Sequence, residues 1–441
     1  MKAAIAHVYC DYKDLKTQSE VELLSSITRQ LAEQTSTMPP AVKKFCEKNA
    51  QKRRNSTDEE WISLVQSICL HFQKTYVFVD ALKKVRKIMN TLLTEVHAFY
   101  TDAIMRIEDQ PEESSQLAKR AISFIFSARR PLNVEELRHA LAVEAEDTEL
   151  DEAALPETEI LLSVCAGLVG IDEKSGTAGL VHYTLQEYLE KNREKLLPEP
   201  EIEVATACLR YLSFDVFGRE PCSDGEALDQ RLRAYRFLDY ASHHWGHHVA
   251  ENQHYERIDL LFTFLEDHQK SSSAVQVLSV GSYRMNDWHN RCRKPSSPLH
   301  IIAFWGLAKV PAILFGNGLN IDNQDSHGAT ILQLAAKRGH NAVVQLLLQR
   351  GANVNLRIES EATALSWAAR NGYKTIAELL LADRASVMTK DNGGWTALDW
   401  AVVGGNNEIL KTLSDHGADI DAEFDGRNKA LYLAAGEEHG L

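Results

Sequence analysis

The sequence predicts a mostly α-helical chain of several domains that ends in a solenoid of helical repeats. Its last third repeats a short motif at a fixed spacing, and its middle contains stretches with the apolar periodicity of amphipathic helices. Only the first part alternates strand-like and helical segments, which is typical of an α/β fold. At 441 residues the chain is long enough for about two to four domains, each with its own core.

The composition is that of an ordinary globular chain, with 44% hydrophobic and 25% charged residues. A formal net charge of −14 disfavours phosphate backbones and anionic lipid headgroups, so we expect no nucleic-acid partner. The seven cysteines are scattered without CxxC spacing, which predicts a reducing compartment. The N-terminus becomes charged before a signal peptide could form, and no apolar run is long enough for a membrane span. We therefore expect a cytoplasmic protein.

The repeat motif determines the expected structure of residues 294–441. It recurs at equal intervals, in segments that begin at Ser297, Thr330, Thr363, Thr396 and Lys429. The threonines are suited to cap a helix, and Gly351 suits a left-handed helix end. The equal spacing, a T-x-L-x-x-A-A start, a Gly nine residues on and an apolar run before G-A-N-V-N resemble the ankyrin repeat. This resemblance implies four ankyrin repeats and a partial fifth.

The repeats depart from the ankyrin pattern at one polar position. The Pro and His of the family's T-P-L-H occur together only in the first repeat, as Pro298 and His300, and the later repeats carry Gln333, Ser366 and Asp399 in place of the histidine. Because that histidine links neighbouring repeats, we expect weaker hydrogen bonding between the later ones.

For residues 101–196 the sequence predicts helices, a hairpin and a further helix. Asn133 followed by Glu136 is a capping-box pattern, and a hairpin is expected around Ser175, with a helix starting from His182. "PLNVEELRHALAVE", "LLSVCAGLV" and "LVHYTLQEYL" resemble the winged-helix module of fungal NACHT proteins, named after GPI inositol-deacylase. Because the chain contains no G-x-S-x-G nucleophile elbow, we do not expect hydrolase activity from this resemblance. A balance of 10 basic to 21 acidic residues over 101–200 argues against DNA binding.

Residues 197–293 resemble the helical linker that joins this winged helix to ankyrin repeats, through "EIEVATACLRYLSFDVF" and "LRAYRFLDYASHHWGHHV". Four histidines at i, i+4 spacing raise the question of a metal site, namely His243, His244, His247 and His248, with His254 nearby. No Cys or Glu completes such a site at convincing spacing. We therefore favour packing between helices, with Tyr240 and Trp245 in the core, and expect neither a metal nor a cofactor.

Residues 1–100 alternate strand and helix, with strands at Ile5–Tyr9 and before Asp80. "VYCDYKDLKTQSEVELLSSITRQLAEQ" and "YVFVDAL" resemble the NACHT, or nephrocystin-3-like, NTPase. The 441 residues contain no G-x-x-x-x-G-K-[ST], and Lys83 and Lys84 stand where the family has acidic residues. We expect a truncated, degenerate NTPase part that binds no nucleotide.

The resemblance implies a non-catalytic protein that binds other proteins through its ankyrin array, derived from fungal NLR-like signalling proteins. No enzymatic activity is expected. The alternative is an ATP-dependent NACHT signalling switch, if a P-loop lies upstream of this chain.

The ankyrin pattern also implies the partner-binding positions. Carried over onto this sequence, they are Ser326, His327, Lys337, Arg338, Glu359, Ser360, Arg370, Asn371, Asn392, Trp395 and Val403. Trp395 is the expected anchor, an exposed indole flanked by Lys337 and Arg370, which suits an acidic or mixed protein surface. Packing of this indole against Trp367 or Trp400 remains the alternative.

Overall fold

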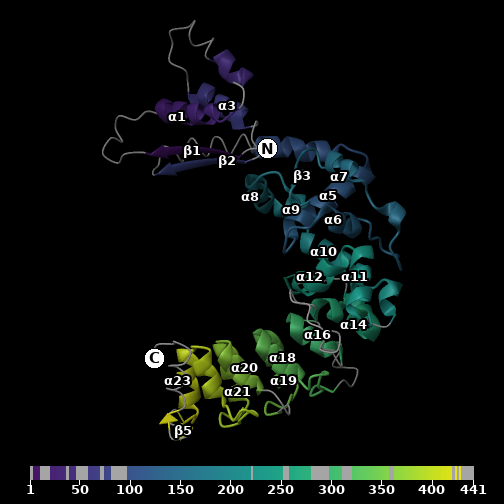
Figure 1. The fold of residues 1–441 in the computed structure, drawn as a ribbon, viewed down its shortest axis with the longest axis vertical. Helices are drawn as coiled ribbons and strands as arrows, with labels where there is room; N and C mark the ends of the chain where they lie inside the picture. Colours follow the sequence, from purple (N-terminus) through teal and green to yellow (C-terminus); the bar gives the residue numbers. More distant parts are fainter. Residues whose placement is uncertain are drawn as a thin grey trace. The chain divides into compact units, whose positions relative to one another are not determined.

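The structure is a computed structural model of the 441-residue chain, drawn in Figure 1. The residues that it describes are 3–9, 20–35, 39–45, 58–69, 74–80, 97–219, 222–251, 258–279, 297–309, 320–356, 362–419, 423–424 and 427–428. The chain forms two compact units, the first of Met1–Val134 with Glu157–Glu199 and the second of Glu135–Pro156 with Pro200–Leu441. The described part is mostly helical, as the sequence predicted.

The first unit begins with the expected α/β segment. Strands β1 (Ala3–Tyr9) and β2 (Lys74–Asp80) pair in parallel, and helices α1 (Glu20–Glu33) and α3 (Asp58–Cys69) connect them in the sequence. α1 packs against both β1 and α3. The register places the end of one strand, Tyr9, opposite the end of the other, Asp80. A parallel pair with intervening helices is the βαβ arrangement that the alternation predicted.

The rest of the first unit contains the predicted hairpin and helices. After a helix at residues 97–108 come α5 (Glu112–Ser127), α7 (Thr158–Val164), β3 (Val169–Ile171), β4 (Ala178–Leu180), α8 (Tyr183–Lys191) and α9 (Arg193–Leu196). β3 and β4 pair in antiparallel fashion, and the ring Nδ1 of His182 caps α8 by accepting from the Thr184 amide. The Tyr100 hydroxyl lies 2.8 Å from Thr184 Oγ1 and ties the first helix to α8. Burial raises the pKa of this phenol.

The second unit starts with a helical region. Its elements are α6 (Val134–Leu141), η1 (Glu152–Ala154), α10 (Pro200–Leu212), η2 (Asp215–Gly218), α11 (Gly225–Ala234), α12 (Leu238–Glu251), α13 (Ile258–Glu266) and α14 (His268–Ser279). α10 and α12 form its most extensive helix pair. Tyr211 is fully buried at its centre, where its hydroxyl lies 2.9 Å from His139 Nδ1 and burial raises its pKa.

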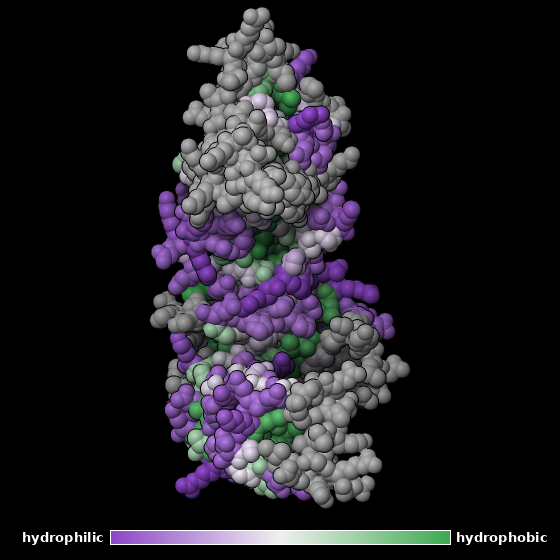
Figure 2. Space-filling model, turned by 90° about the vertical axis from the view of Figure 1, so that its left-hand side faces the viewer, coloured by the Kyte–Doolittle hydropathy of each residue, from purple (hydrophilic) through white to green (hydrophobic). Residues whose placement is uncertain are grey.

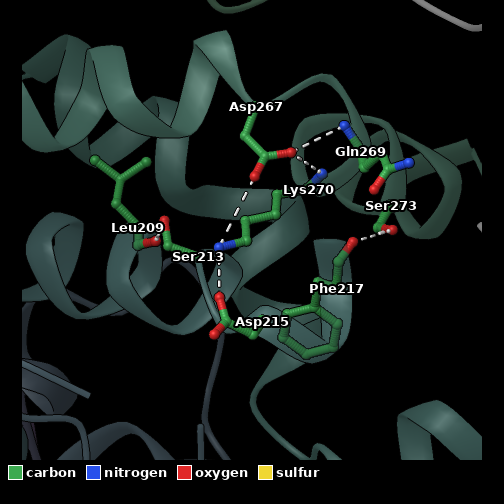
Figure 3. Close-up of polar contacts among 8 residues, drawn as sticks. All are labelled: Leu209, Ser213, Asp215, Phe217, Asp267, Gln269, Lys270 and Ser273. Carbon is green, nitrogen blue, oxygen red and sulfur yellow. Dashed lines mark hydrogen bonds and ion pairs between the residues drawn. The ribbon is translucent and has the colours of Figure 1, made fainter. Parts of the chain in front are cut away.

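Polar contacts fasten η2 to α14 within this helical region (Figure 3). The ammonium of Lys270 lies 3.0 Å from Asp215 Oδ1 and 3.8 Å from Asp267 Oδ2. Ser273 Oγ donates to the carbonyl oxygen of Phe217 over 2.9 Å. The short helix therefore has both a charged and a buried neutral connection to α14.

The last part of the second unit is an array of paired helices, green to yellow in Figure 1. We call the first helix of each pair an inner helix: α16 (Pro298–Trp305), α18 (Ile331–Arg338), α20 (Ala364–Arg370) and α22 (Ala397–Val403). The outer helices are α19 (Asn341–Gln349), α21 (Lys374–Ala382) and α23 (Asn407–Asp415). Each inner helix packs on the next inner helix, and each outer helix on the next outer one. A hairpin of β5 (Glu423–Phe424) and β6 (Arg427–Asn428) follows.

The predicted caps start three of the inner helices. Thr330, Thr363 and Thr396 each accept, through the side chain, the amide proton of the residue three positions on. Each inner helix is followed by a Gly with positive φ, and at Gly306 a Cβ would overlap the imidazole of His340. Gly306 is thus needed both for its conformation and for space. The predicted fifth repeat, from Lys429, lies outside the described residues.

The expected weakening of hydrogen bonds between repeats is wrong at Gln333. His300 Nε2 donates to the Ala329 carbonyl over 3.2 Å, and Gln333 Nε2 donates to the Leu356 carbonyl over 3.0 Å. The amide of Gln333 has two ends, so its oxygen closes the capping box on Thr330 while its nitrogen reaches the next repeat. Glutamine thus also bonds to the loop that follows its repeat, but at Leu356 and not at Ala362, the position equivalent to Ala329.

Candidate protein-binding face of the repeat array

The inner helices share one face that is built from equivalent positions of the repeat. Phe304, Lys337, Arg370 and Val403 follow one another at intervals of one repeat, and Ile301, Leu334, Trp367 and Trp400 form a second row three residues earlier in each helix. The first row is exposed or half-buried, whereas the alanines beside it are buried between helices. We call the surface that these two rows line the inner-helix face.

Cations on this face lie over aromatic rings. Lys337 Nζ is 3.8 Å from the ring centroid of Trp367, and Arg370 Cζ is 4.8 Å from that of Trp400 and 5.8 Å from that of Trp367. Arg338 Cζ lies 3.8 Å from the centroid of the Phe304 ring. All these distances are within the range in which a ring quadrupole attracts a cation. The positive charges are therefore held over the face by its own aromatic residues.

The loops before the inner helices, which we call fingers, are shaped by aspartates. Asp325 Oδ1 accepts the amide protons of His327 and Ala329, each over 2.9 Å. Asp391 Oδ1 does the same in a later finger, for Gly393 and Trp395. A side chain that accepts from amides two and four residues on fixes the turn that leads into the helix.

The expectation that the Trp395 indole is exposed is wrong. Its indole is half-buried and packs on Trp400, with ring centroids 5.0 Å apart. Trp400 is itself held by a hydrogen bond of 2.9 Å from its Nε1 to Asp391 Oδ2. Packing on Trp400 was the alternative that the sequence left open. The rings under Lys337 and Arg370 are Trp367 and Trp400, because the finger directs Trp395 back onto its own helix.

The other predicted contact residues lie on the same array. Those with exposed side chains are Ser326, His327, Arg338, Arg370, Asn371 and Asn392, and Lys337 and Val403 are half-buried. Asn371 Nδ2 donates to the Lys337 carbonyl over 3.1 Å, so one of these side chains also joins two repeats. Glu359 and Ser360 lie outside the described residues.

A hollow of about 780 Å³ opens on the inner-helix face, between α14, α16, α18 and α20. The lining includes four residues that the sequence reasoning missed, Val275 and Leu278 of α14, Phe304 and Trp367. The register of the repeat identifies two of them, because Phe304 stands one repeat before Lys337 and Trp367 stands one repeat before Trp400. The two α14 residues precede the repeat and have no such signal.

The histidines of the helical region are used in packing. His248 is fully buried, with Nδ1 2.7 Å from Glu201 Oε2 and Nε2 2.9 Å from the Tyr240 hydroxyl. Tyr240 and Trp245 are core residues, as predicted. Among the described residues, no group of three or more His, Cys, Asp or Glu side chains is placed to hold a metal ion. His254 lies outside them.

Comparison with protein families agrees with this geometry. The family model for ankyrin repeats matches residues 247–358 and 357–424. The last part of the chain is an ankyrin-repeat array. The first stretch of that ankyrin match includes α13 and α14, the two helices that precede the first copy of the repeated motif. The hollow is thus lined by helices within the ankyrin match.

Two further family models match the preceding parts of the chain. Residues 107–198 match the GPI inositol-deacylase winged-helix domain, and residues 1–108 match the nephrocystin 3 N-terminal domain. The predicted order of these domains before the ankyrin repeats is confirmed. No curated protein matched the chain. In the part of the chain that the structure describes, no helix is both long and apolar enough to cross a membrane.

Proposed function

We propose that this chain is a non-catalytic binding protein that holds another protein on the inner-helix face of its ankyrin array. The observation that carries the proposal is the row of cations held over aromatic rings on successive inner helices. Aromatic residues and arginine are the side chains in which binding energy concentrates at protein interfaces. Ankyrin repeats are protein-interaction modules, which supports the same conclusion.

The burial pattern of α20 supports a recognition role for its outward positions. Ala368 and Ala369 are fully buried and provide the packing between helices, whereas Arg370 beside them is exposed. Packing of the array alone does not require a large cation at this position. Removing the guanidinium is therefore expected to affect binding more than folding.

The test is selection of binders from a displayed library of protein fragments on the full chain, followed by calorimetry with variants. Fragments that lose binding to Arg370→Ala and Val403→Asp, but bind Lys411→Ala normally, support the proposal; Lys411 is exposed on the outer helix α23. Selected fragments that bind all three variants as they bind the wild type contradict it. Circular dichroism of each variant separates loss of binding from loss of fold.

The nephrocystin 3 N-terminal match supports a second candidate, the ATP-dependent switch. Against it, the 441 residues lack a P-loop motif, whose backbone amides and Lys provide most triphosphate affinity. The switch requires a P-loop upstream of this sequence, so a transcript that encodes one would favour it, and calorimetry with Mg²⁺-ATP tests whether this chain binds nucleotide by itself. Saturable binding of ATP by this chain at micromolar concentration would favour the switch.

A further inference from the structure

We infer that the hollow between α14, α16, α18 and α20 takes an acidic peptide segment that carries one large apolar side chain. This inference rests on the proposed function and adds where the partner binds and what chemistry it presents. It is carried by the shape of the hollow, the charge around it and the way in which that charge is held in place. Each of these gives a separate requirement for the partner.

Part of the hollow is lined by buried apolar side chains. Ile301 and Leu334 line it and are each 5% exposed, with Val275 and Leu278 of α14 on one side and Trp367 among the other lining residues. A volume of about 780 Å³ exceeds that of one side chain and suits a short peptide segment. One aromatic or aliphatic anchor packed against these side chains would lose its own contact with water and gain about 25 cal/mol for each Å² of apolar area buried.

The lining carries more positive than negative charge. Among the described lining residues, Lys337, Arg338 and Arg370 are cationic and Asp325 is acidic. Asp325 is 7% exposed, and one of its oxygens accepts two backbone amide protons in its finger. The whole chain has a net charge of −14, so this local excess of cations is a departure from the rest of the molecule. A concave apolar site concentrates such a field and favours carboxylates.

The cationic side chains of the hollow are held in place by aromatic rings before a partner binds. A guanidinium stacked on a ring keeps its N–H groups in its own plane, where carboxylate oxygens bind. The positions of the Arg338 guanidinium over Phe304 and of the Arg370 guanidinium over Trp400 thus restrict two long side chains before any partner arrives. Side chains that are already ordered lose less entropy on binding, so the same contacts give more affinity.

Cations with aromatic residues also bind single-stranded nucleic acid, but the observations favour a peptide. A nucleic acid carries a phosphate at every nucleotide and follows a long groove, whereas this hollow is a single depression on a strongly acidic chain. A short acidic peptide segment can instead place its few carboxylates beside the cationic side chains of the hollow. Figure 2 shows hydrophobic surface bordered by hydrophilic residues in the lower half of its view, where the repeat helices lie.

The experiment uses the full chain and a fluorescein-labelled synthetic peptide, rich in Asp and Glu, with one central Leu. Two matched peptides carry Ser in place of Leu, or Asn and Gln in place of the acids, and oligo(dT) serves as the polyanion. We expect saturable polarisation with the first peptide, binding at least about tenfold weaker for both matched peptides, and weakening as salt rises.

Variants then locate the site. Lys337→Glu with Arg370→Glu should weaken binding by at least about tenfold, and Lys337→Gln with Arg370→Gln should weaken it less while keeping the packed stems. The matched control, Arg350→Glu with Lys411→Glu, reverses two exposed charges at the outer helices and should bind as wild type.

Equal binding of the amide peptide, an unchanged affinity in both Lys337 and Arg370 pairs, or tighter binding of oligo(dT) would each overturn the inference. If library fragments require the inner-helix face while no acidic peptide binds, the proposed function stands and the inference fails. If library fragments ignore that face, the proposed function itself fails.

Discussion

Gly246 in α12 lies directly against the indole of Trp305 in α16, so that a Cβ atom on the glycine would overlap Cδ2 and Cγ of that ring and lie 2.7 Å from Cε2. Trp305 is 6% exposed and also packs against Trp245 and His247. The missing side chain at Gly246 therefore allows the helical region to contact the first inner helix of the array. No rotamer change of a flexible side-chain end would relieve the overlap, since the contact is with the ring fusion of a buried indole.

Gly246→Ala should destabilise the protein by about 1–3 kcal/mol, the usual cost of overpacking, even though alanine favours helix by about 1 kcal/mol. Gly218→Ala is the matched control, because its Cβ would meet only the flexible side chain of Lys270, with Cε at 3.2 Å. Urea unfolding of both variants measures the difference. Equal midpoints would show that Trp305 moves aside without cost.

We expect His340 to make the stability of the array depend on pH. Its Nε2 donates to the Phe304 carbonyl over 3.0 Å. Burial lowers its pKa below the ordinary 6.5, and the charge of Arg338 lowers it further, against the opposing effect of the hydrogen bond. The unfolded chain therefore takes up the proton first as the pH falls. Stability from this group is complete above about pH 6.5 and is lost as the pH falls from there through the lower folded pKa.

His340→Asn should remove that part of the pH dependence. Asn406 occupies the equivalent position two repeats on and donates to the Arg370 carbonyl over 3.0 Å, and Arg370 is the equivalent of Phe304, so asparagine has a precedent for the same bond. Near pH 8 we expect the variant within about 1 kcal/mol of the wild type. The free energy of unfolding of the wild type and of the variant, each measured at pH 8 and at pH 5.5, tests this expectation. An identical loss in both proteins would assign the effect to other groups, such as His139, whose pKa burial also lowers.

The sequence predicted most of the array because the start and the end of each inner helix depend on residues within the same repeat. Caps at Thr330, Thr363 and Thr396 and the following glycines determine where the inner helices start and stop, and the structure agrees. The candidate site was less predictable. Trp395 is directed onto Trp400 by the turn at Asp391, and the neighbour of a side chain across repeats depends on their spacing. Side-chain contacts of this kind depend on how the repeats pack and not on the local sequence pattern.

Ser273→Ala should destabilise the helical region by about 1–3 kcal/mol, because it leaves the Phe217 carbonyl without the hydroxyl that donates to it. Ser273 is 2% exposed, so water cannot readily replace that donor. Thr263→Val is the control, since its exposed hydroxyl donates only to a carbonyl of its own helix. It should change stability by less than about 0.5 kcal/mol. Equal effects in urea would contradict a special role for the buried bond.

Arg384→Gly should stabilise the array. Arg384 has φ 66°, and it occupies the slot in which Gly351 and Gly417 stand, with φ 84° and 90°. A left-handed conformation costs a non-glycine residue about 1–2 kcal/mol, whereas glycine adds about 0.5–1 kcal/mol of unfolded-state entropy. The net gain should be about 0.5–1 kcal/mol in thermal or urea unfolding. A less stable variant would mean that the arginine side chain contributes more than its backbone strain costs.

Trp395→Ala should affect both folding and binding. The indole packs on Trp400 at a centroid distance of 5.0 Å, and an aromatic pair contributes about 0.5–1.5 kcal/mol beyond its buried area, so a moderate loss of stability is expected. Because Trp400 also lies under Arg370, loss of its neighbour should loosen the cation that faces a partner, and binding should weaken by about 2 kcal/mol.

Two control substitutions separate these effects. Trp395→Phe keeps a ring against Trp400 and should recover most of the stability and much of the affinity. Met388→Ala removes a side chain that is 53% exposed and belongs to neither row of the inner-helix face, so neither quantity should change. Thermal unfolding and calorimetry with a fragment selected on the wild type provide the two readouts. If Trp395→Ala lowers the melting temperature strongly while affinity stays unaltered, the residue serves the finger alone and the partner lies elsewhere on the array.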